Sequence, residues 1–519
     1  MSKISRPSRR EFLKTGASLG ALCLAHQVFP AIARGRTRKD KPNVVFLWTD
    51  QQRADTMAAY GNSRIHAPNL NRLAAESTVF ERNYVTQPIC TPSRGSIVTG
   101  LWPSQHGCVR NNIPLPADAL THPELLDDDD YRTAFLGKWH LGDEIWPQRG
   151  FEEWAGIEDL YIRHYSEGRD RTSKSAYHHF LVENGFEPDI EREGQRVFSR
   201  EFSARLPLRF SKPAFLRRRA RDFIRRHRDE PFMLHVNFLE PHDPNFGPFD
   251  GYHPEDEVPL PGNWQDYPDE SEPVRYQYLR KYAAMTRGIT EKDIKRETSR
   301  YWGLVTMVDM AVGGILGELE KWGLDDNTIV VYTSDHGEQM GSHGLYWKGV
   351  IYEESARVPM LLRYPRKGFG KQRIERPVSS IDITPTLMDL LGVPEKAEGL
   401  PGRSWSRYLG RDAKPESVFY QWHWKRSGRM HTLADRGLMP REVADSAAHL
   451  NSRTIVTREG LKLCLREKEV SQLFDLGKDP HEIHNLYGAK RLSKDVSRLT
   501  REVEAWQESI GDDLEVHPS

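Results

Sequence analysis

The stretch Val44-Val45-Phe46-Leu47-Trp48, followed by Thr49-Asp50-Gln51-Gln52-Arg53, decides the fold class of this chain. Its first five residues are all apolar, and such a run predicts a strand buried on both faces, as in a parallel sheet covered by helices. The change to polar residues at Thr49 marks the carboxyl end of that strand. Ligand sites of open α/β sheets lie at this end, so we expect Asp50 to belong to one.

Strand and helix patterns alternate on either side of this stretch. Further buried strands are predicted at Tyr131–Leu136, Phe232–Leu239 and Thr328–Tyr332. Helices are predicted at Asn69–Ser77, at Pro92–Thr99, around Phe215–Ile224, from Leu304 to Leu319, and in a segment that Thr384 would cap and Gly392 would end. This alternation is typical of an α/β domain, with a large, mostly parallel sheet flanked by helices.

The pattern changes after about residue 410. Short strands separated by turns are predicted at Val418–Trp424, Arg453–Thr457, Leu461–Leu465 and Gln472–Leu476, and a charged helix at Leu492–Ser509. We therefore predict a catalytic domain over residues 38–410 and a smaller α+β subdomain with an antiparallel sheet over residues 411–519.

Residues 1–33 have the features of an export signal. A basic segment, Ser8-Arg9-Arg10-Glu11-Phe12-Leu13-Lys14, precedes an apolar stretch from Ala17 to Val28 and an Ala31-Ile32-Ala33 cleavage site. The paired arginines predict the twin-arginine type, which makes the twin-arginine translocase a partner. The apolar stretch is shorter than the about twenty residues that span a bilayer, and no other stretch is predicted to span one. We expect an exported protein, periplasmic or extracellular.

Composition excludes several classes of protein. The 519 residues carry 74 Lys+Arg and 74 Asp+Glu, and 38% are hydrophobic, which is typical of a soluble globular protein. Without residues 1–33 the chain keeps 69 basic and 73 acidic side chains. This balance argues against nucleic acid as a partner. Four scattered cysteines are too few for a disulfide scaffold or a zinc ribbon.

Polar motifs follow each of the four predicted buried strands. They are Asp50, Gly137-Lys138-Trp139-His140-Leu141-Gly142, Glu240-Pro241-His242-Asp243-Pro244 and Ser334-Asp335-His336-Gly337. Because the carboxyl ends of parallel strands lie at one edge of a sheet, we expect a single pocket.

The expected pocket combines metal ligands with positive charge. Asp50, Asp335 and His336 could bind one divalent cation, and the two carboxylates favour a hard ion over zinc. The side chains that supply positive charge or donate protons are those of Arg94, Lys138, His140, His242 and Lys348. A cation beside basic groups is suited to a tetrahedral oxyanion, either sulfate or phosphate.

A cysteine occurs in the segment Cys90-Thr91-Pro92-Ser93-Arg94-Gly95, which continues to Gly100. Pro92 in a first helical turn places Cys90 at a helix N-terminus, where free N–H groups favour anions and would activate a thiolate. The alternative is a small buried cysteine, a common environment for this residue type.

With these motifs the chain resembles the formylglycine-dependent sulfatases of the alkaline phosphatase superfamily. The resemblance rests on Thr49–Arg53, Cys90–Gly100, Gly137–Gly142, Pro241-His242, Thr333–Gly337 and Lys348, and continues through Ser379–Leu391 to Gln472–Leu476, Asp479-Pro480 and Asn485-Leu486. It covers nearly the whole chain after residue 33 and implies an alkaline-phosphatase-like fold.

The resemblance implies that a formylglycine-generating enzyme oxidises Cys90 to formylglycine (3-oxoalanine), whose hydrated aldehyde is the nucleophile. Arg94 would then hold the hydrated aldehyde, and Lys138 and Lys348 would bind sulfate oxygens. His140 would help to deprotonate the diol, and His242 would act as general acid toward the departing alcohol. The implied ligands of one divalent cation, calcium (Ca²⁺) before magnesium or manganese, are Asp50, Gln51, Cys90, Asp335 and His336.

Two positions depart from the pattern of many sulfatases. Gln51 stands where a second aspartate is usual, and His336 where an asparagine is usual. Related phosphonate monoester and phosphodiester hydrolases, which use the same formylglycine, show similar substitutions and are the alternative. A catalytically inactive anion-binding or glycan-binding relative is a second alternative, against which the intact nucleophile motif argues.

The alcohol part of the substrate would contact the long segments 150–213 and 245–300, which are rich in Tyr, Trp, His and Arg. That composition suits a sugar with several anionic groups, so a sulfated carbohydrate is predicted. Choline sulfate or another small sulfate ester stays open. Trp422, His423 and Trp424 could reach the rim of the pocket.

Overall fold

The computed structural model describes residues 40–192, 195–268, 272–409, 416–423, 433–447 and 450–516. The predicted export signal and Trp424 lie outside these residues. Residues Arg38–Ser519 form one compact unit.

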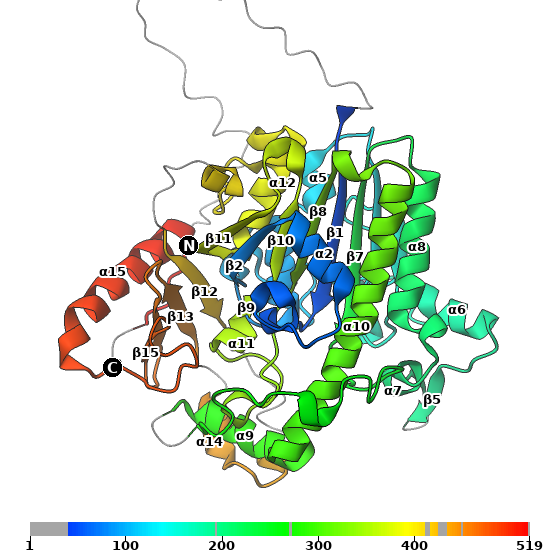
Figure 1. Cartoon of the computed structure of the whole chain (residues 1–519). Helices are drawn as coiled ribbons and strands as arrows, with labels where there is room; N and C mark the ends of the chain where they lie inside the picture. The colour runs from blue at the N-terminus through cyan, green and yellow to red at the C-terminus, as the bar shows by residue number, and fades with distance from the viewer. Residues whose placement is uncertain are drawn as a thin grey trace, which may run out of the picture. The chain divides into compact units, whose positions relative to one another are not determined.

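A large mixed sheet forms the centre of this unit (Figure 1). Within the described residues its order is β11-β2-β10-β8-β1-β7-β3-β4, with β9 paired to β2. The strands are β1 (Asn43–Asp50), β2 (Thr78–Tyr84), β3 (Arg132–Gly137), β4 (Glu153–Gly156), β7 (Phe232–Pro241), β8 (Thr328–Ser334), β9 (Arg357–Val358), β10 (Met360–Arg363) and β11 (Gln372–Ser379). Strands β8, β1, β7, β3 and β4 are parallel, whereas β10 is antiparallel to both of its neighbours. The predicted mostly parallel sheet is confirmed.

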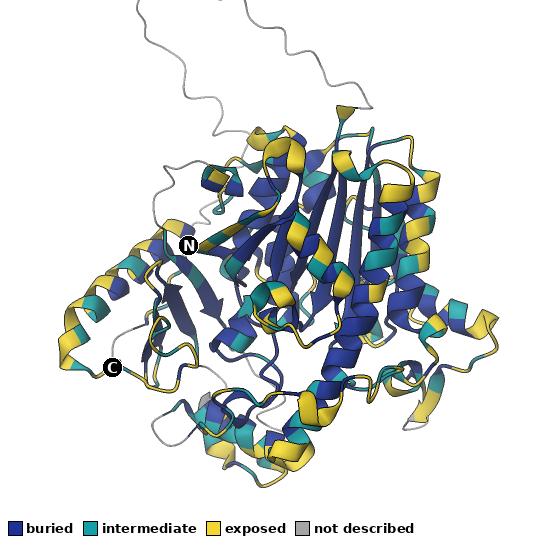
Figure 2. Ribbon diagram, in the orientation of Figure 1, coloured by how far each residue is buried: buried dark blue, intermediate teal, exposed yellow. Residues whose placement is uncertain are grey.

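Strand β1 is buried on both faces because helices cover both sides of the sheet (Figure 2). Val45 and Leu47 pack with residues of α2 (Pro68–Glu76), α8 (Lys212–Arg226) and α10 (Glu291–Lys321). Phe46 and Trp48 belong to the opposite cluster, with residues of α3 (Cys90–Thr99), α5 (His122–Leu126) and α12 (Ile383–Leu391). Successive side chains of a strand point to opposite faces, so an uninterrupted apolar run is what this position requires.

Helix α10 is longer than its apolar pattern predicts, because it begins at Glu291 with a capping box between Thr290 and Asp293. It is the one helix of the described residues that is long and apolar enough to cross a membrane, which the sequence-based expectation of no further span did not foresee. In this fold, however, 78% of the most apolar part of α10 is buried, and the helix packs on β7 and α8 as a core helix.

The predicted cap of α12 is wrong. A 3-10 turn, Ser380–Asp382, leads directly into the helix, which begins at Ile383. Thr384 therefore lies inside the first turn, and its hydroxyl donates to the carbonyl oxygen of Ile97 at 3.2 Å. The predicted end is correct, since Gly392 takes the left-handed conformation that follows the last turn.

The C-terminal sheet is antiparallel in the order β12-β13-β14-β15, as predicted. Its strands are Val418–Trp422, Ser452–Val456, Leu461–Arg466 and Gln472–Asp475, and α15 covers Ser493–Ile510. Leu463 and Leu465 pack under α15, whereas Cys464 points to the other face, toward Tyr84 and Tyr352 of the main sheet region. The domain boundary at residue 410 stays a prediction.

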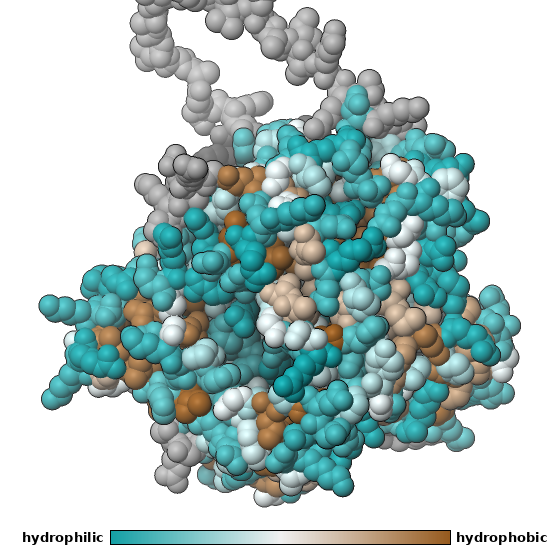
Figure 3. Space-filling view, viewed as in Figure 1, coloured by the Kyte–Doolittle hydropathy of each residue, from teal (hydrophilic) through white to brown (hydrophobic). Residues whose placement is uncertain are grey.

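The two long segments expected near the substrate carry short elements of their own. These are α6 (Ala176–Glu183), α7 (Arg200–Ala204), α9 (Val274–Thr286) and the hairpin of β5 (Asp189–Arg192) and β6 (Gln195–Phe198). The other short helices are α4 (Pro103–His106), α11 (Glu353–Ala356) and α14 (Arg441–Ala447). On the face drawn in Figure 3, hydrophobic residues form separate patches among hydrophilic ones.

Candidate active site

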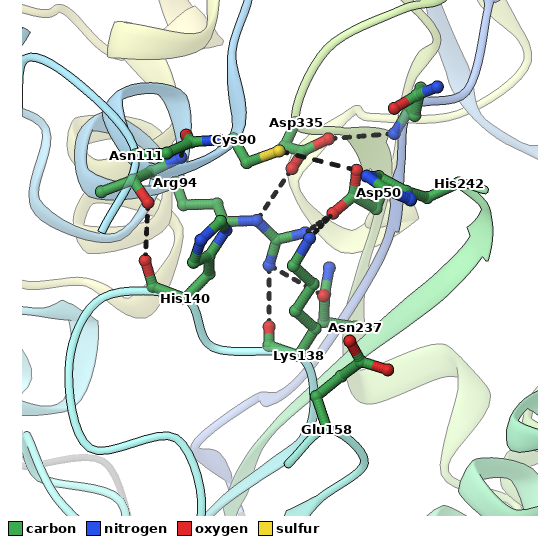
Figure 4. Close-up of polar contacts among 12 residues, drawn as sticks. Asp50, Cys90, Arg94, Asn111, Lys138, His140, Glu158, Asn237, His242 and Asp335 are labelled. Carbon is green, nitrogen blue, oxygen red and sulfur yellow. Dashed lines mark hydrogen bonds and ion pairs between the residues drawn. The ribbon is translucent and has the colours of Figure 1, made fainter. Parts of the chain in front are cut away.

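Four neighbouring parallel strands, β8, β1, β7 and β3, end at the same edge of the sheet. Asp50 is the last residue of β1, and Lys138, His242 and Asp335 come directly after β3, β7 and β8. Figure 4 shows the side chains of these residues together with Cys90 and Arg94 of α3.

Cys90 is the first residue of α3 and is buried. Its Sγ lies 3.2 Å from His336 Nε2 and 4.0 Å from Asp50 Oδ1. Burial and the charge of Asp50 raise the pKa of the thiol, but Lys348, Lys138 and His336 outweigh them and bring the pKa down to about 7. The thiol is therefore more acidic than an ordinary cysteine, because cations surround it.

Arg94 lies one helical turn after Cys90 and is fully buried. Its guanidinium donates to Asp335 Oδ2 at 2.8 Å and to Asp50 Oδ2 at 2.9 Å. It also donates to the Lys138 carbonyl oxygen at 2.7 Å and to Asn237 Oδ1 at 2.8 Å. Arg94 thus joins α3 to residues in or directly after four strands and forms an ion pair with both carboxylates.

Lys138 is the closest cation to Asp50, with 2.5 Å between Nζ and Oδ2. Burial would raise the pKa of Asp50, but the charges of Lys138 and Arg94 hold it well below its usual value. Asp50 is therefore a carboxylate at neutral pH despite full burial.

Four buried side chains form a group that could hold one metal ion. The ligand atoms of Asp50, Cys90, Asp335 and His336 all lie within 4.8 Å of one another. His336 Nε2 faces the group, 3.6 Å from Asp50 Oδ1, while its Nδ1 bonds the Gly337 carbonyl oxygen at 2.9 Å. A hydrogen bond from the second ring nitrogen to a backbone carbonyl oxygen fixes the orientation of a histidine that binds a metal.

Gln51 lies beside this group, with its side-chain amide held from both ends. Its Oε1 accepts a hydrogen bond from Lys348, and its Nε2 donates to Glu338. The backbone nitrogen of Gln51 donates to Asp335 Oδ1 at 3.1 Å. Gln51 was predicted as a metal ligand, but in this structure its amide oxygen accepts a hydrogen bond from Lys348.

Glu338 was not predicted as a site residue. It is buried, and besides Gln51 it accepts hydrogen bonds from the backbone nitrogens of Met340 and Trp347. Burial and the charge of Asp243 raise its pKa. The position of Glu338, three residues after Asp335, was a signal in the sequence that it lies near the site. Its hydrogen bond to Gln51 could not be predicted, because the two residues are far apart in the chain.

His140 follows β3 in a turn where its φ is +60°. Glu144 fixes this turn by accepting from the backbone nitrogens of Trp139 at 2.8 Å and His140 at 2.7 Å. The ring Nε2 lies 2.8 Å from Asn112 Oδ1, and the Tyr161 ring packs against it with 4.3 Å between centroids. Burial and the charges of Lys138 and Arg94 lower the pKa of His140 well below its usual value, so the ring is neutral.

His242 comes directly after β7, and its Nδ1 lies 3.1 Å from the carbonyl oxygen of Asp243. Arg287 and the Trp347 indole hold the Asp243 carboxylate, the latter at 2.9 Å. Burial and the charge of Lys348 lower the pKa of His242 well below its usual value. This ring is also neutral in the free protein.

The C-terminal sheet approaches the segment that carries Lys348. The Trp422 ring lies against Gly349, the residue after Lys348, and Arg275 stacks on that ring at 4.6 Å. His423 bonds Gln421 Oε1 at 3.0 Å. Trp422 therefore supports the loop behind Lys348.

Comparison with known proteins agrees with this geometry. The family model described as Sulfatase matches residues 42–393, which is more than half of the chain. The chain belongs to the sulfatase family. This family lies in the alkaline phosphatase superfamily, and its members are hydrolases of sulfate esters.

Three relatives illustrate the range of the similarity. The ulvan-active sulfatase of Formosa agariphila is 27% identical and covers 91% of this chain and 82% of its own length. The N-acetylglucosamine-6-O-sulfatase of Bacteroides thetaiotaomicron is 26% identical, covering 95% of this chain and 90% of its own. The solved phosphonate monoester hydrolase of Agrobacterium radiobacter is 21% identical with a TM-score of 0.71, covering 91% and 96%, which is a likeness of fold.

Proposed function

We propose that this sulfatase hydrolyses sulfate monoesters of a carbohydrate, using a formylglycine made from Cys90 and one divalent cation. The observation that carries the proposal is the position of Cys90 at the start of α3, among Asp50, Lys138 and His336, with Arg94 one turn behind it. The sulfatase relatives that share most of the chain support the reaction, and the sugar in one relative's name supports the substrate class.

The donor set fits a divalent cation. Asp50 and Asp335 supply hard oxygen ligands, His336 supplies a nitrogen, and position 90 completes the group. Arg94 and Lys138 already pair with these two carboxylates, so the fit to a cation rests on the donor atoms and their spacing. When bound, the cation would polarise the sulfuryl group. We propose calcium first, with magnesium or manganese as alternatives.

The aldehyde at position 90, as its hydrate, would supply the nucleophile. Arg94 would orient it, because the guanidinium is fixed by Asp335, Asp50 and backbone oxygen and cannot turn away. Lys138 and Lys348 both lie close enough to Cys90 for their charges to lower the pKa of its thiol. They would bind the sulfate oxygens.

The two histidines would move protons. His140 is neutral, and its Nδ1 is buried without a hydrogen-bond partner among the described residues, so it can accept a proton. His242 is neutral in the free protein because Lys348 is close. An anionic substrate beside Lys348 offsets that charge, which raises the pKa of His242 and lets it protonate the departing alcohol.

Maturation and export form a sequence in this proposal. A formylglycine-generating enzyme would convert Cys90 before folding, and the twin-arginine translocase would then export the folded enzyme to the periplasm or beyond. Mass spectrometry of the peptide containing residue 90, isolated from exported protein, tests this. Finding only unmodified cysteine would refute it.

The central experiment measures sulfate release from a panel of desalted sulfated glycans, choline sulfate and an aryl sulfate. We expect the highest kcat/KM with a sulfated sugar and no release by Cys90→Ala. Turnover by Cys90→Ala at the wild-type rate would disprove the role of Cys90.

Hydrolysis of phosphonate monoesters or phosphate diesters is the second candidate. Gln51 and His336 favour it, since both depart from the usual sulfatase residues. The test compares kcat/KM on an aryl sulfate with that on an aryl phosphonate of the same leaving group. A faster reaction with the phosphonate would reverse the order of the two candidates.

A further inference from the structure

Three basic side chains lie in two short segments that adjoin the site. Arg110 and Arg163 are exposed, and His164 is half-buried. Arg110 lies in the loop after α4, and the other two belong to the 3-10 turn Ile162–His164. We call these three residues the basic rim.

Direct contacts tie the first segment to the reacting centre. Asn111, the residue after Arg110, accepts a hydrogen bond through Oδ1 from the backbone nitrogen of Thr91 at 3.0 Å. Thr91 directly follows Cys90. The next residue, Asn112, meets His140 at 2.8 Å and donates its backbone nitrogen to Thr91 Oγ1 at 3.2 Å. The backbone of Arg110 is therefore held close to the start of α3.

The second segment is tied to the same place by Tyr161. Its ring packs on His140, and the turn with Arg163 and His164 follows directly. His140, Tyr161 and His164 line one small cavity with Asn112. Burial, then the charges of Arg163 and Arg110, lower the pKa of His164, which indicates that the three basic groups are neighbours.

The two arginines of the basic rim differ from other arginines near the site in their ion pairing. Arg200 is paired with Glu158, and Arg287 with Asp243 and Glu297. Among the described residues, Arg110 and Arg163 have no carboxylate within ion-pair distance. Two exposed guanidinium groups without a carboxylate partner, in segments that adjoin the site, favour binding of an anion.

We propose that the basic rim binds a second anionic group, a sulfate or a carboxylate, on the sugar whose sulfate ester is cleaved. The inference rests on the proposed function and narrows its substrate class to sugars that carry at least two anionic groups. The rim would contact only the leaving group, because Lys138 and Lys348 would bind the reacting sulfate.

The test uses the double variant Arg110→Gln/Arg163→Gln and four substrates. These are an aryl sulfate, a monosulfated sugar, the same sugar with a second sulfate, and a monosulfated disaccharide with a uronic acid. We expect kcat/KM to fall about tenfold with the two-anion sugars and less than about twofold with the other two, since each partly exposed contact contributes a few-fold. The last two substrates distinguish sulfate from carboxylate as the second group.

Arg219→Gln is the matched control, because Arg219 is an exposed arginine of α8 without an ion pair in the described residues. This control substitution should leave kcat/KM unchanged for all four substrates. Equal losses on all substrates, or no loss on any, would overturn the inference.

Calorimetric binding of the same sugars to Cys90→Ala, with and without the rim substitutions, decides the inference independently of turnover. We expect the rim substitutions to weaken binding of two-anion sugars about tenfold and to reduce its salt dependence. Unchanged binding would refute the basic rim alone. No sulfate release from any substrate by protein with formylglycine at position 90 would refute the proposed function alone.

Discussion

Replacement of Arg94 by lysine tests whether geometry or charge alone holds the site together. Arg94 is fully buried and donates four hydrogen bonds, two of them to Asp50 and Asp335. Lysine keeps the positive charge but offers a single nitrogen in place of a planar fork. It cannot reach all four acceptors.

The expected loss follows from the acceptors that stay buried. Arg94→Lys should leave the Lys138 carbonyl oxygen and Asn237 Oδ1 without a hydrogen-bond donor. Each unsatisfied buried acceptor lowers the free energy of unfolding by about 1–3 kcal/mol, so the two together lower it by about 2–6 kcal/mol. Arg94→Met also removes the charge and leaves Asp50 and Asp335 less compensated, which costs about 3–5 kcal/mol more. The order of stability should be wild type, then Arg94→Lys, then Arg94→Met.

Urea unfolding of the metal-free protein measures these differences, and kcat/KM on an aryl sulfate measures the effect on catalysis. We expect Arg94→Lys to lower kcat/KM by about 10² to 10³, because the nucleophile loses its orientation. Arg366→Lys is the control, since Arg366 pairs with Asp326 at the surface and should change stability by less than about 0.5 kcal/mol. If Arg94→Lys behaves like this control in both assays, the geometric reasoning is refuted.

Three further predictions concern pH and metal. Burial raises the pKa of Glu158, but the charges of Arg200 and Lys212 outweigh it and bring the pKa to about 2. The ion pairs of Glu158 should therefore stabilise the fold by about 3 kcal/mol above pH 4.5, and this contribution should be lost as the pH falls toward 2. The unfolding free energies of wild type and Glu158→Gln should therefore converge over that range. Burial lowers the pKa of His122, beside His235, to about 4, so His122 alone should contribute a fall of about 2 kcal/mol in the unfolding free energy from pH 6.5 to pH 5. The stability of His122→Gln should therefore fall by about that much less than the stability of wild type over this range. Dialysis against a chelator should lower both the melting temperature and sulfate release, and added Ca²⁺ or Mg²⁺ should restore both; unchanged values after verified metal removal would contradict the metal site.

The sequence predicts the centre of the fold well because burial there leaves a strong pattern. Strand β1 must be apolar on both faces, and Asp50 ends this strand, while Asp335 directly follows the similarly buried β8. The strands toward one edge were missed for the opposite reason. Strand β11 alternates half-buried and exposed residues over its first five positions, which include Arg373 and Glu375, so it lacks a continuous apolar run.

The interactions that tune the site were not predictable, because their partners are remote in the chain. Gln51 meets Lys348 and Glu338 across nearly 300 residues. Asn237 is a buried polar residue inside a mostly apolar strand, and that mismatch was a usable signal for its bond to Arg94. Local pattern predicts which side chains reach the sheet edge, whereas register and loop geometry decide which of them touch.

Gln51 changes the charge available to the substrate. Asp50 and Asp335 neutralise Arg94, and Asp50 also pairs with Lys138. Lys348 meets the neutral amide of Gln51, so its charge stays available for an incoming anion. An aspartate at position 51 would pair with Lys348 and weaken that attraction. A sulfate monoester and a phosphonate monoester both carry one negative charge, so both gain equally from Lys348. Selection between substrates therefore falls to the groups that contact the leaving group, and the basic rim favours an anionic sugar there.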